Sequence, residues 1–158
     1  MGTFNPSSLF KESNFRLQLK QNMPALEVMV NVTNIPGFST GQMEFKRPGI
    51  IDKRPGEHLA FEDLLLTVLC DEKLEAYKEI HNYLLNISNP KTASIDPFEA
   101  IFDSSLLLTT NKNNLQHKIT FYNCFFKTVG DINLTATTES DNQISFQLTL
   151  GYSYFIFE

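Results

Sequence analysis

The closing stretch of the chain, residues 144–157, reads ISFQLTLGYSYFIF and alternates between two sets of side chains with a period of two. The apolar set is Ile144, Phe146, Leu148, Leu150, Tyr152, Tyr154 and Ile156, and the small or polar set is Ser145, Gln147, Thr149, Gly151 and Ser153. Successive side chains of a β-strand point to opposite faces, so this period predicts one long strand with one buried face. Such strands are typical of antiparallel sheets.

Three segments in the first half of the chain also predict strands. Residues 15–20 and 26–32 each alternate, and Asn22-Met23-Pro24 separates them, so we expect an N-terminal hairpin. Residues 59–70 are apolar at nearly every position, which is typical of a strand buried on both faces.

The second half predicts another hairpin. A strand opened by Leu106 and Leu108 reaches a turn at residues 111–114, and its partner covers residues 116–128. A shorter strand is expected at residues 134–136, followed by a polar turn.

One segment has the period of a helix. Asp71 is placed as an N-cap, and residues 72–86 form the predicted amphipathic helix, which ends before Asn89-Pro90. Its apolar residues recur at spacings of three or four: Leu74, Tyr77, Ile80, Leu84 and Ile87. Together these elements predict a mainly β (α+β) fold, an antiparallel β-sandwich or part-barrel with one helix, in a single domain covering residues 1–158.

Residues 36–57 hold three Pro-Gly pairs and predict a protruding loop. The motif KRPG occurs at 46–49 and again at 53–56, and each Pro-Gly favours a bend rather than a helix. Asp52 and Glu57 partly offset its cations, no aromatic residue is interleaved, and the chain has a net charge of −5. These features argue against a nucleic-acid arm.

The sequence carries no recognisable catalytic or metal-binding motif. The three histidines lack metal-ligand spacing, and Cys70 and Cys124 are isolated within apolar runs, which predicts two buried thiols. We therefore expect no enzymatic activity, no cofactor and no small-molecule substrate. The N-terminus lacks the pattern of a signal peptide, so we expect the chain to begin in the cytoplasm.

The order of these elements resembles the tail tube proteins of contractile-tailed, T4-like bacteriophages. The resemblance covers nearly the whole chain and differs at Phe126, where that family often has proline, and in the extra basic bend at 46–49. The stretches that carry it are NIPG (34–37), RPGE (54–57), FEDL (61–64), DEK (71–73), ITFYNCF (119–125), VGDI (129–132) and FQLTLGY (146–152).

The resemblance implies a homo-hexameric ring in which each subunit contributes strands to one large β-barrel. Stacked rings would form a tube in the virion tail, assembled in the host cytoplasm, with sheath and baseplate proteins as partners. DNA would pass through the lumen without specific binding during ejection. Closing a barrel from several chains also removes exposed strand edges, which otherwise invite aggregation.

Within this framework the loop at 36–57 is expected to contact a neighbouring subunit or ring. The candidate contact residues are Phe45, Lys46, Arg47, Ile50, Ile51, Lys53 and Arg54. A lumen that lets DNA slide should be polar or acidic, because DNA carries about one charge per 1.7 Å. The candidate lumen residues are Thr135, Thr137, Glu139, Asp141, Gln147 and Thr149.

Several alternatives stay open. The chain is also compatible with a tube-initiating baseplate protein, a tube terminator, or a tube protein of a related injection or secretion machine. In a different class, the aromatic residues Tyr152, Tyr154, Phe155 and Phe157 would line the pocket of a ligand-binding β-barrel.

Overall fold

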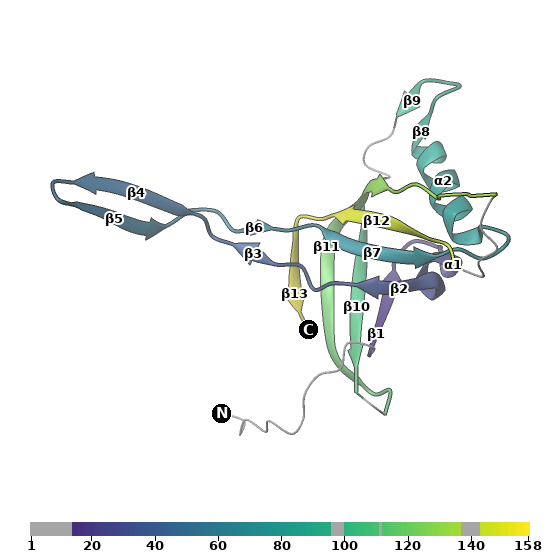
Figure 1. The fold of residues 1–158 in the computed structure, drawn as a ribbon, viewed down its shortest axis with the longest axis horizontal. Helices are drawn as coiled ribbons and strands as arrows, with labels where there is room; N and C mark the ends of the chain where they lie inside the picture. The colour runs from purple at the N-terminus through teal and green to yellow at the C-terminus, as the bar shows by residue number, and fades with distance from the viewer. Residues whose placement is uncertain (1–13, 96–99, 111, 137–142) are drawn as a thin grey trace.

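The computed structural model describes residues 14–95, 100–110, 112–136 and 143–158. Two layers of antiparallel strands make the body of the molecule, two helices lie toward one end, and a long two-stranded arm extends from the other (Figure 1). The fold is therefore mainly β and antiparallel, as the alternating segments predict.

The main sheet contains seven strands in the order β1-β10-β11-β12-β7-β2, with β13 added beside β11. Every pairing is antiparallel. The bounds are β1 (Phe15–Leu19), β2 (Val30–Thr33), β7 (Leu64–Leu69), β10 (Phe102–Thr109), β11 (Leu115–Val129), β12 (Ser145–Gly151) and β13 (Tyr154–Phe157).

Strand β11 is shared by two layers because its backbone bends at Asn123. Residues 119–122 pair with β13, whereas Phe125 and the residues after it pair with β12. Asn123 has a φ of 56°, a left-handed conformation that asparagine tolerates better than most residues. We call the layer of β1, β10, the first part of β11 and β13 sheet A, and the layer of residues 125–129, β12, β7 and β2 sheet B.

The core lies between the two sheets. Sheet A contributes Leu17, Leu106, Ile119 and Phe121, and sheet B contributes Leu64, Leu66, Val68, Phe146, Leu148 and Leu150, all at most 2% exposed. Burying each large apolar side chain contributes about 1.5–3 kcal/mol, so this double row supplies the main stabilisation of the fold.

The closing stretch forms two strands rather than the single strand predicted. Phe146, Leu148 and Leu150 are buried as expected, but after Ser153 the phase shifts by one residue, so that Phe155 is buried while Tyr154 is exposed. The chain leaves sheet B at Gly151 and joins sheet A, where the Ser153 amide donates to the carbonyl of Tyr122 (3.0 Å).

The predicted N-terminal hairpin is wrong, because residues 24–29 form helix α1 (Pro24–Met29). The Glu79 carboxylate accepts hydrogen bonds from the amides of Ala25 (3.4 Å) and Leu26 (3.2 Å), which would otherwise lack partners in the first turn. Strands β1 and β2 consequently pair with β10 and β7, not with each other.

The main helix, α2 (Glu75–Ile87), begins three residues later than predicted. Leu74 precedes it with a φ of 53°, and the Asp71 carboxylate accepts from the amide of Glu75 (2.9 Å), so Asp71 still satisfies an amide of the first turn. A two-residue hairpin, β8 (Ser88–Asn89) with β9 (Ser94–Ile95), follows α2. None of the described helices is long and apolar enough to cross a membrane.

Two strand predictions need correction. The run at 59–70 divides into β6 (Ala60–Phe61) and β7, and β7 is covered on one face only, since Leu65 is 52% exposed. Residues 130–136 form no strand, and Leu134 is 81% exposed there. Apolar composition alone misleads at both places, because an open face can carry leucine.

Candidate assembly surfaces

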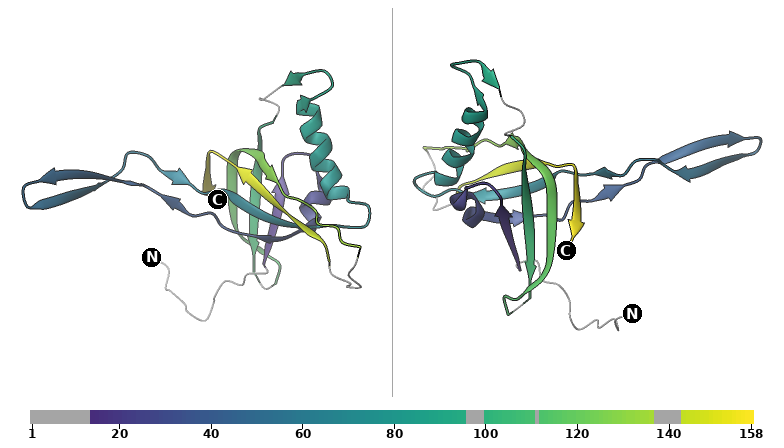
Figure 2. Two further views of the ribbon diagram at one scale, coloured as in Figure 1. Left: turned by 45° about the horizontal axis from the view of Figure 1, so that its top comes forward. Right: turned by 180° about the vertical axis from the view of Figure 1, so that it is seen from behind.

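The arm is a direct continuation of β2 and β7 away from the body (Figures 1 and 2). At its base β3 (Phe38–Ser39) pairs with β6, and beyond it β4 (Gln42–Arg47) pairs with β5 (Ile50–Pro55) around the turn at Pro48-Gly49. Gly49 has a φ of 83°, which explains the requirement for glycine at this turn. We call residues 42–55 the arm.

One face of the arm combines apolar and cationic side chains. The register places on it Met43, Phe45, Arg47, Ile50, Asp52 and Arg54. Asp52 lies between two guanidinium groups, 3.7 Å from Arg47 and 3.6 Å from Arg54. The guanidinium of Arg54 also lies 5.2 Å from the centre of the Phe45 ring, within cation–π range.

The structure therefore brings all seven predicted contact residues onto the arm, on two faces. Phe45, Arg47, Ile50 and Arg54 share the first face, and Lys46, Ile51 and Lys53 share the second. Ile50 is 64% exposed and no arm residue is buried. A two-stranded hairpin without a core is marginal in water, so the arm is a candidate contact surface.

The outward face of sheet B carries few charges and mixes polar with apolar side chains, since Val32, Leu65 and Phe125 are 53%, 52% and 42% exposed there. Gln147 and Thr149 lie on it, and the Thr67 hydroxyl donates to the Gln147 side-chain oxygen (3.3 Å). One ion pair, Lys127 with Asp63 (2.7 Å), crosses this side of the sheet. Of the other predicted lumen residues, Thr135 is exposed outside any strand, and Thr137, Glu139 and Asp141 lie outside the described residues.

Sheet B has two open borders in the part of the chain that the structure describes. Strand β2 pairs with β7 alone, and residues 125–129 of β11 pair with β12 alone. Each border therefore presents backbone amides and carbonyls that another strand can pair with.

An aromatic cluster, which the sequence analysis does not identify, runs from the core to the surface at the base of the arm. Phe155 is the centre of it, with ring centres 5.5 Å from Phe121, 5.3 Å from Phe61 and 6.1 Å from Phe38. Phe157 lies 5.9 Å from Phe155 on the outer side. The inner rings are buried, but Phe38 and Phe157 are each 61% exposed, so the cluster ends in an open apolar surface.

Tyr152 joins this cluster to the arm base by a polar contact. Its hydroxyl donates to the carbonyl of Glu62 (2.6 Å). Burial, with a contribution from nearby Asp63, raises the pKa of Tyr152 to about 12, because both disfavour the phenolate. The residues proposed to line a ligand pocket are instead divided, since Tyr152 and Phe155 are in ring contact while Tyr154 stacks on Tyr122 (4.8 Å).

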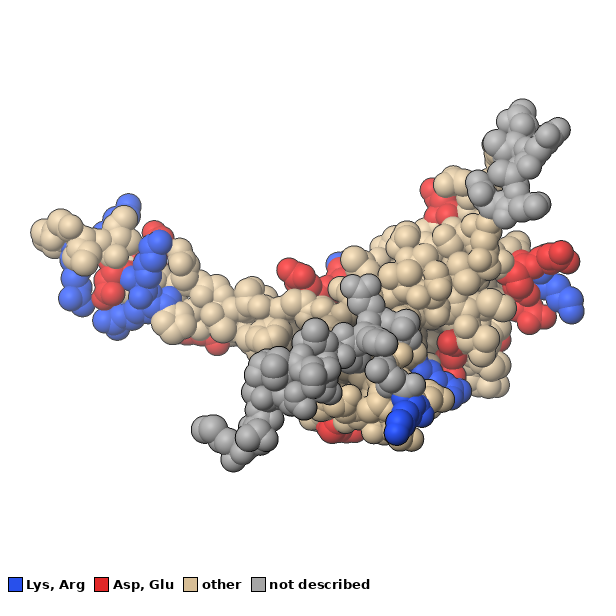
Figure 3. Space-filling model, turned by 60° about the horizontal axis from the view of Figure 1, so that its bottom comes forward, with Lys and Arg blue, Asp and Glu red and all other residues tan. Residues whose placement is uncertain are grey.

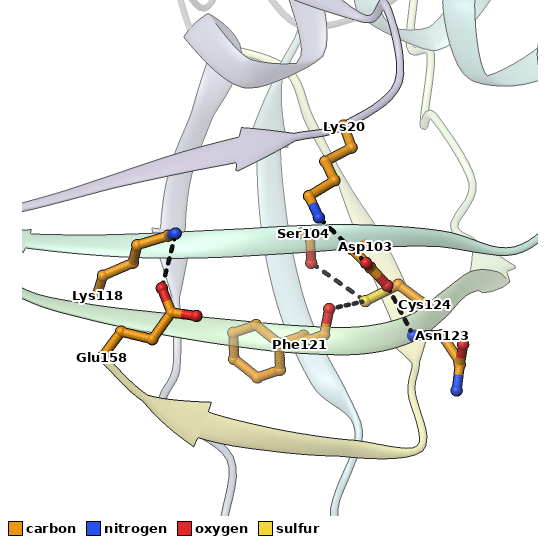
Figure 4. A network of polar contacts seen from close by, with 8 residues as sticks. All are labelled: Lys20, Asp103, Ser104, Lys118, Phe121, Asn123, Cys124 and Glu158. Atoms are coloured by element: carbon orange, nitrogen blue, oxygen red, sulfur yellow. Dashed lines mark hydrogen bonds and ion pairs between the residues drawn. The ribbon is translucent and has the colours of Figure 1, made fainter.

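A network of polar contacts braces the bend of β11 (Figure 4). Asp103 forms an ion pair with Lys20 (3.2 Å) and accepts from the amide of Asn123 (3.2 Å). Ser104 lies 3.2 Å from the Cys124 sulfur, and burial raises the pKa of this thiol. These contacts give Asp103 and Cys124 a structural role at the bend.

Lys118 and Glu158 form a second part of the network at the end of β13 (Figure 4). Their side chains lie 2.7 Å apart, and this hydrogen bond lowers the pKa of Glu158. The described residues contain no group of His, Cys, Asp and Glu side chains that would hold a metal ion.

Sequence comparison finds no matching family model and no matching curated protein. The fold, however, matches solved structures. A chain of the sheath–tube complex of an extracellular contractile injection system, PVC, in its extended state has a TM-score of 0.68 and 14% identity, covering 99% of both chains. A chain of the anti-feeding prophage cap, the AFP tube-terminating cap, has a TM-score of 0.68 and 15% identity, covering 100% of this chain and 94% of that one.

A more distant match is Hcp1 from Flavobacterium johnsoniae, with a TM-score of 0.54 and 10% identity, covering 91% of this chain and 94% of that one. The TM-scores and coverages establish a shared fold, and at these identities they establish the fold alone. The chain has the tube-protein-like architecture of contractile injection assemblies over almost its entire length.

Proposed function

We propose that this chain is a structural subunit of the tube of a contractile injection apparatus, with no catalytic role. The observation that carries the proposal is the pair of open borders of sheet B, β2 and residues 125–129, together with the exposed arm. Neither feature serves an isolated subunit, and both are explained by assembly with further copies.

The strand directions of sheet B suit ring closure. Neighbouring strands of sheet B alternate in direction, so β2 of one copy meets residues 125–129 of the next in antiparallel orientation. Repeating this contact continues the sheet from copy to copy until it closes as a barrel. A chain of the 6-fold symmetrised baseplate structure of the anti-feeding prophage has a similar fold, with a TM-score of 0.61 and 11% identity, and we propose six copies here, a homo-hexamer.

The outward face of sheet B then lines the lumen, with Gln147 and Thr149 facing the cargo. In the finer form of the proposal the tube belongs to a phage tail of the T4-like kind, assembled in the host cytoplasm, and conducts DNA. A lining of hydroxyl, amide and apolar side chains suits passage without binding, because it offers the phosphates little positive charge. Sheath and baseplate proteins would be the partners outside and below the tube.

The same fold serves a layer at either end of the tube. A chain of the AFP tube-terminating cap matches this chain as well as a chain of the PVC sheath–tube complex does, both at a TM-score of 0.68. A terminator or a tube-initiating baseplate protein is therefore the alternative within the same class. It predicts single rings in place of long tubes.

Purified full-length chain tests the proposal by size-exclusion chromatography and negative-stain electron microscopy over a range of protein concentrations. Rings or stacked tubes with a central opening are expected. A monomer at every concentration, with no rings on the grid, would overturn the proposal.

A cysteine pair tests ring closure directly. Asn31→Cys on β2 and Thr128→Cys on β11 should form a disulfide between copies under mild oxidation, giving a ladder of covalent oligomers on non-reducing gels. Thr128→Cys alone, which keeps the native cysteines Cys70 and Cys124, is the matched control and should give no ladder.

A further inference from the structure

We infer that the arm of one copy docks on the aromatic surface at the base of another copy's arm, formed by Phe38, Phe61, Phe155 and Phe157. This inference rests on the proposed function, because it needs a second copy, and it names the receiving surface that the tube proposal leaves open. We call these four residues the aromatic patch.

Both surfaces are apolar, and both remain largely exposed in the part of the chain that the structure describes. On the patch, Phe38 and Phe157 are each 61% exposed. On the arm, Phe45 is 45% and Ile50 is 64% exposed, and both lie on the same face. Exposed aromatic surface of this kind gains most from being covered, and aromatic residues are enriched at protein interfaces.

The charges around these surfaces are complementary. The arm carries Lys46, Arg47, Lys53 and Arg54 against only Glu44 and Asp52. The chain beside the patch carries Glu57 and Glu62, both exposed, while the adjacent Asp63 is paired with Lys127. Figure 3 shows the same separation, with Lys and Arg gathered at the outer end of the arm and acidic side chains along the stem that joins it to the body.

The arm does not reach its own patch. The two ladders, β3 with β6 and β4 with β5, follow one another in an extended ribbon, so the tip points away from the body (Figure 2). The connection is also tightly held, because Gly56 donates to the carbonyl of Gly41 (3.2 Å) and a side chain at 56 would lie 2.4 Å from the carbonyl oxygen of Thr40.

Docking between copies is therefore head to tail: the tip of one arm lies on the base of the next. Such a contact uses two different surfaces, so a docked pair keeps one free tip and one free patch, and the contact propagates. Propagation along the tube axis is what the stacking of rings requires.

Photo-crosslinking tests the docking surface. The photoreactive residue p-benzoylphenylalanine replaces Phe45, and the variant is mixed with isotope-labelled wild-type chain before illumination, so that mass spectrometry recognises bonds between copies. Crosslinks to residues 35–38, 57–62 or 154–157 of the labelled chain are expected.

The outcomes separate this inference from the proposed function. Crosslinks between copies that fall only elsewhere, for example on α2, overturn the docking surface and leave the tube proposal standing. Tubes without any crosslink from position 45 overturn it as well. Absence of rings and tubes overturns the proposed function itself.

Charge reversal supplies a second test. Glu57→Lys with Glu62→Lys, and separately Arg47→Glu with Arg54→Glu, should each raise the concentration for half-assembly at least about tenfold, because like charges then face each other. Mixing the two double variants should restore part of the assembly, since each supplies the partner charge the other needs. Glu72→Lys with Glu75→Lys, the same change at the start of α2, should have little effect, and an equal loss there would overturn the inference.

Discussion

The ring of Phe125 lies directly over Gly151, the residue opposite it in the ladder between β11 and β12. A side-chain carbon at position 151 would lie 2.5 Å from the ring's Cζ atom, closer than such contacts occur. The ring therefore favours glycine at position 151, the point where the chain leaves sheet B.

Gly151→Ala should lower the free energy of unfolding by about 1–3 kcal/mol, the usual cost of forcing an added carbon into a packed site. Phe125 is 42% exposed, so its ring has room to turn outward, which favours the lower end of that range. In a Phe125→Ala background the same substitution should be neutral or stabilising, because the clash is gone and alanine suits a strand better than glycine. Urea unfolding of the wild type, the two single variants and the double variant gives the coupling free energy between positions 125 and 151. Additive effects of the two substitutions would contradict the explanation.

The alternating period predicts the antiparallel sheets because each strand of sheet B buries one face only. It fails near the end of the chain, where Tyr154, Phe155, Ile156 and Phe157 are all large and apolar. With apolar residues on both faces, the sequence does not indicate which face is buried, so the shift at Ser153 could not be predicted. The chain changes sheets here because β11 pairs with two strands along one side, with β12 through residues 125–129 and with β13 through residues 119–122.

Helix α1 carries one local signal, Pro24 in its first turn, but the alternation of the residues after it hides this signal. Residues 26–32 alternate as a strand does, and the group that satisfies the first amides, Glu79, comes 53 residues after Leu26. Tertiary contacts override local preference in such short segments.

The position of the arm in the chain and its contact residues could be predicted, because Pro-Gly pairs mark turns in the local sequence. The arrangement of its residues on two faces depends on strand register, and the aromatic cluster depends on contacts between β3, β6 and β13, which no local pattern encodes. Gln147 and Thr149 were identified for the same reason as the strands, since they form the polar half of an alternating segment.

Replacing Asn123 by glycine should cost little stability, whereas replacing it by alanine should destabilise the protein. Its φ of 56° costs an ordinary residue about 1–2 kcal/mol, a strain that glycine does not have. We therefore expect Asn123→Ala to lower the free energy of unfolding by about that amount and Asn123→Gly to change it by less than about 0.5 kcal/mol. Both substitutions remove the side-chain contact to Ser153, so the comparison isolates the backbone conformation. Equal losses in urea unfolding would show that the side chain, not the bend, matters.

The free energy of unfolding should fall at alkaline pH because of the Tyr152 side chain. Its pKa rises from 10.0 to about 12 on folding, so between these values the unfolded chain has released a proton that the folded chain retains. The contribution is therefore complete below pH 10 and is lost as pH rises toward about 12. The loss of unfolding free energy over this window should be smaller in Tyr152→Phe than in the wild type.

Tyr154→Phe is the matched control for this effect, since Tyr154 lies two residues away and is 45% exposed. It should keep the alkaline loss of the wild type. An unchanged alkaline profile in Tyr152→Phe would show that other groups cause the loss. At neutral pH the Tyr152→Phe variant should also be less stable by about 0.5–1.5 kcal/mol, because the hydrogen bond to the Glu62 carbonyl is removed.

Replacing Phe45 and Ile50 by serine should leave the subunit folded and weaken its assembly. Both side chains lie on the arm, where no residue is buried, so the free energy of unfolding of the single subunit should change by less than about 0.5 kcal/mol. Each covered apolar side chain contributes about 1.5–3 kcal/mol to a contact, so the concentration for half-assembly should rise at least tenfold, as sedimentation would measure. Val28→Ser, at a side chain 77% exposed on α1, is the matched control and should assemble normally. Normal tubes from the double variant would mean that the arm is not an assembly surface.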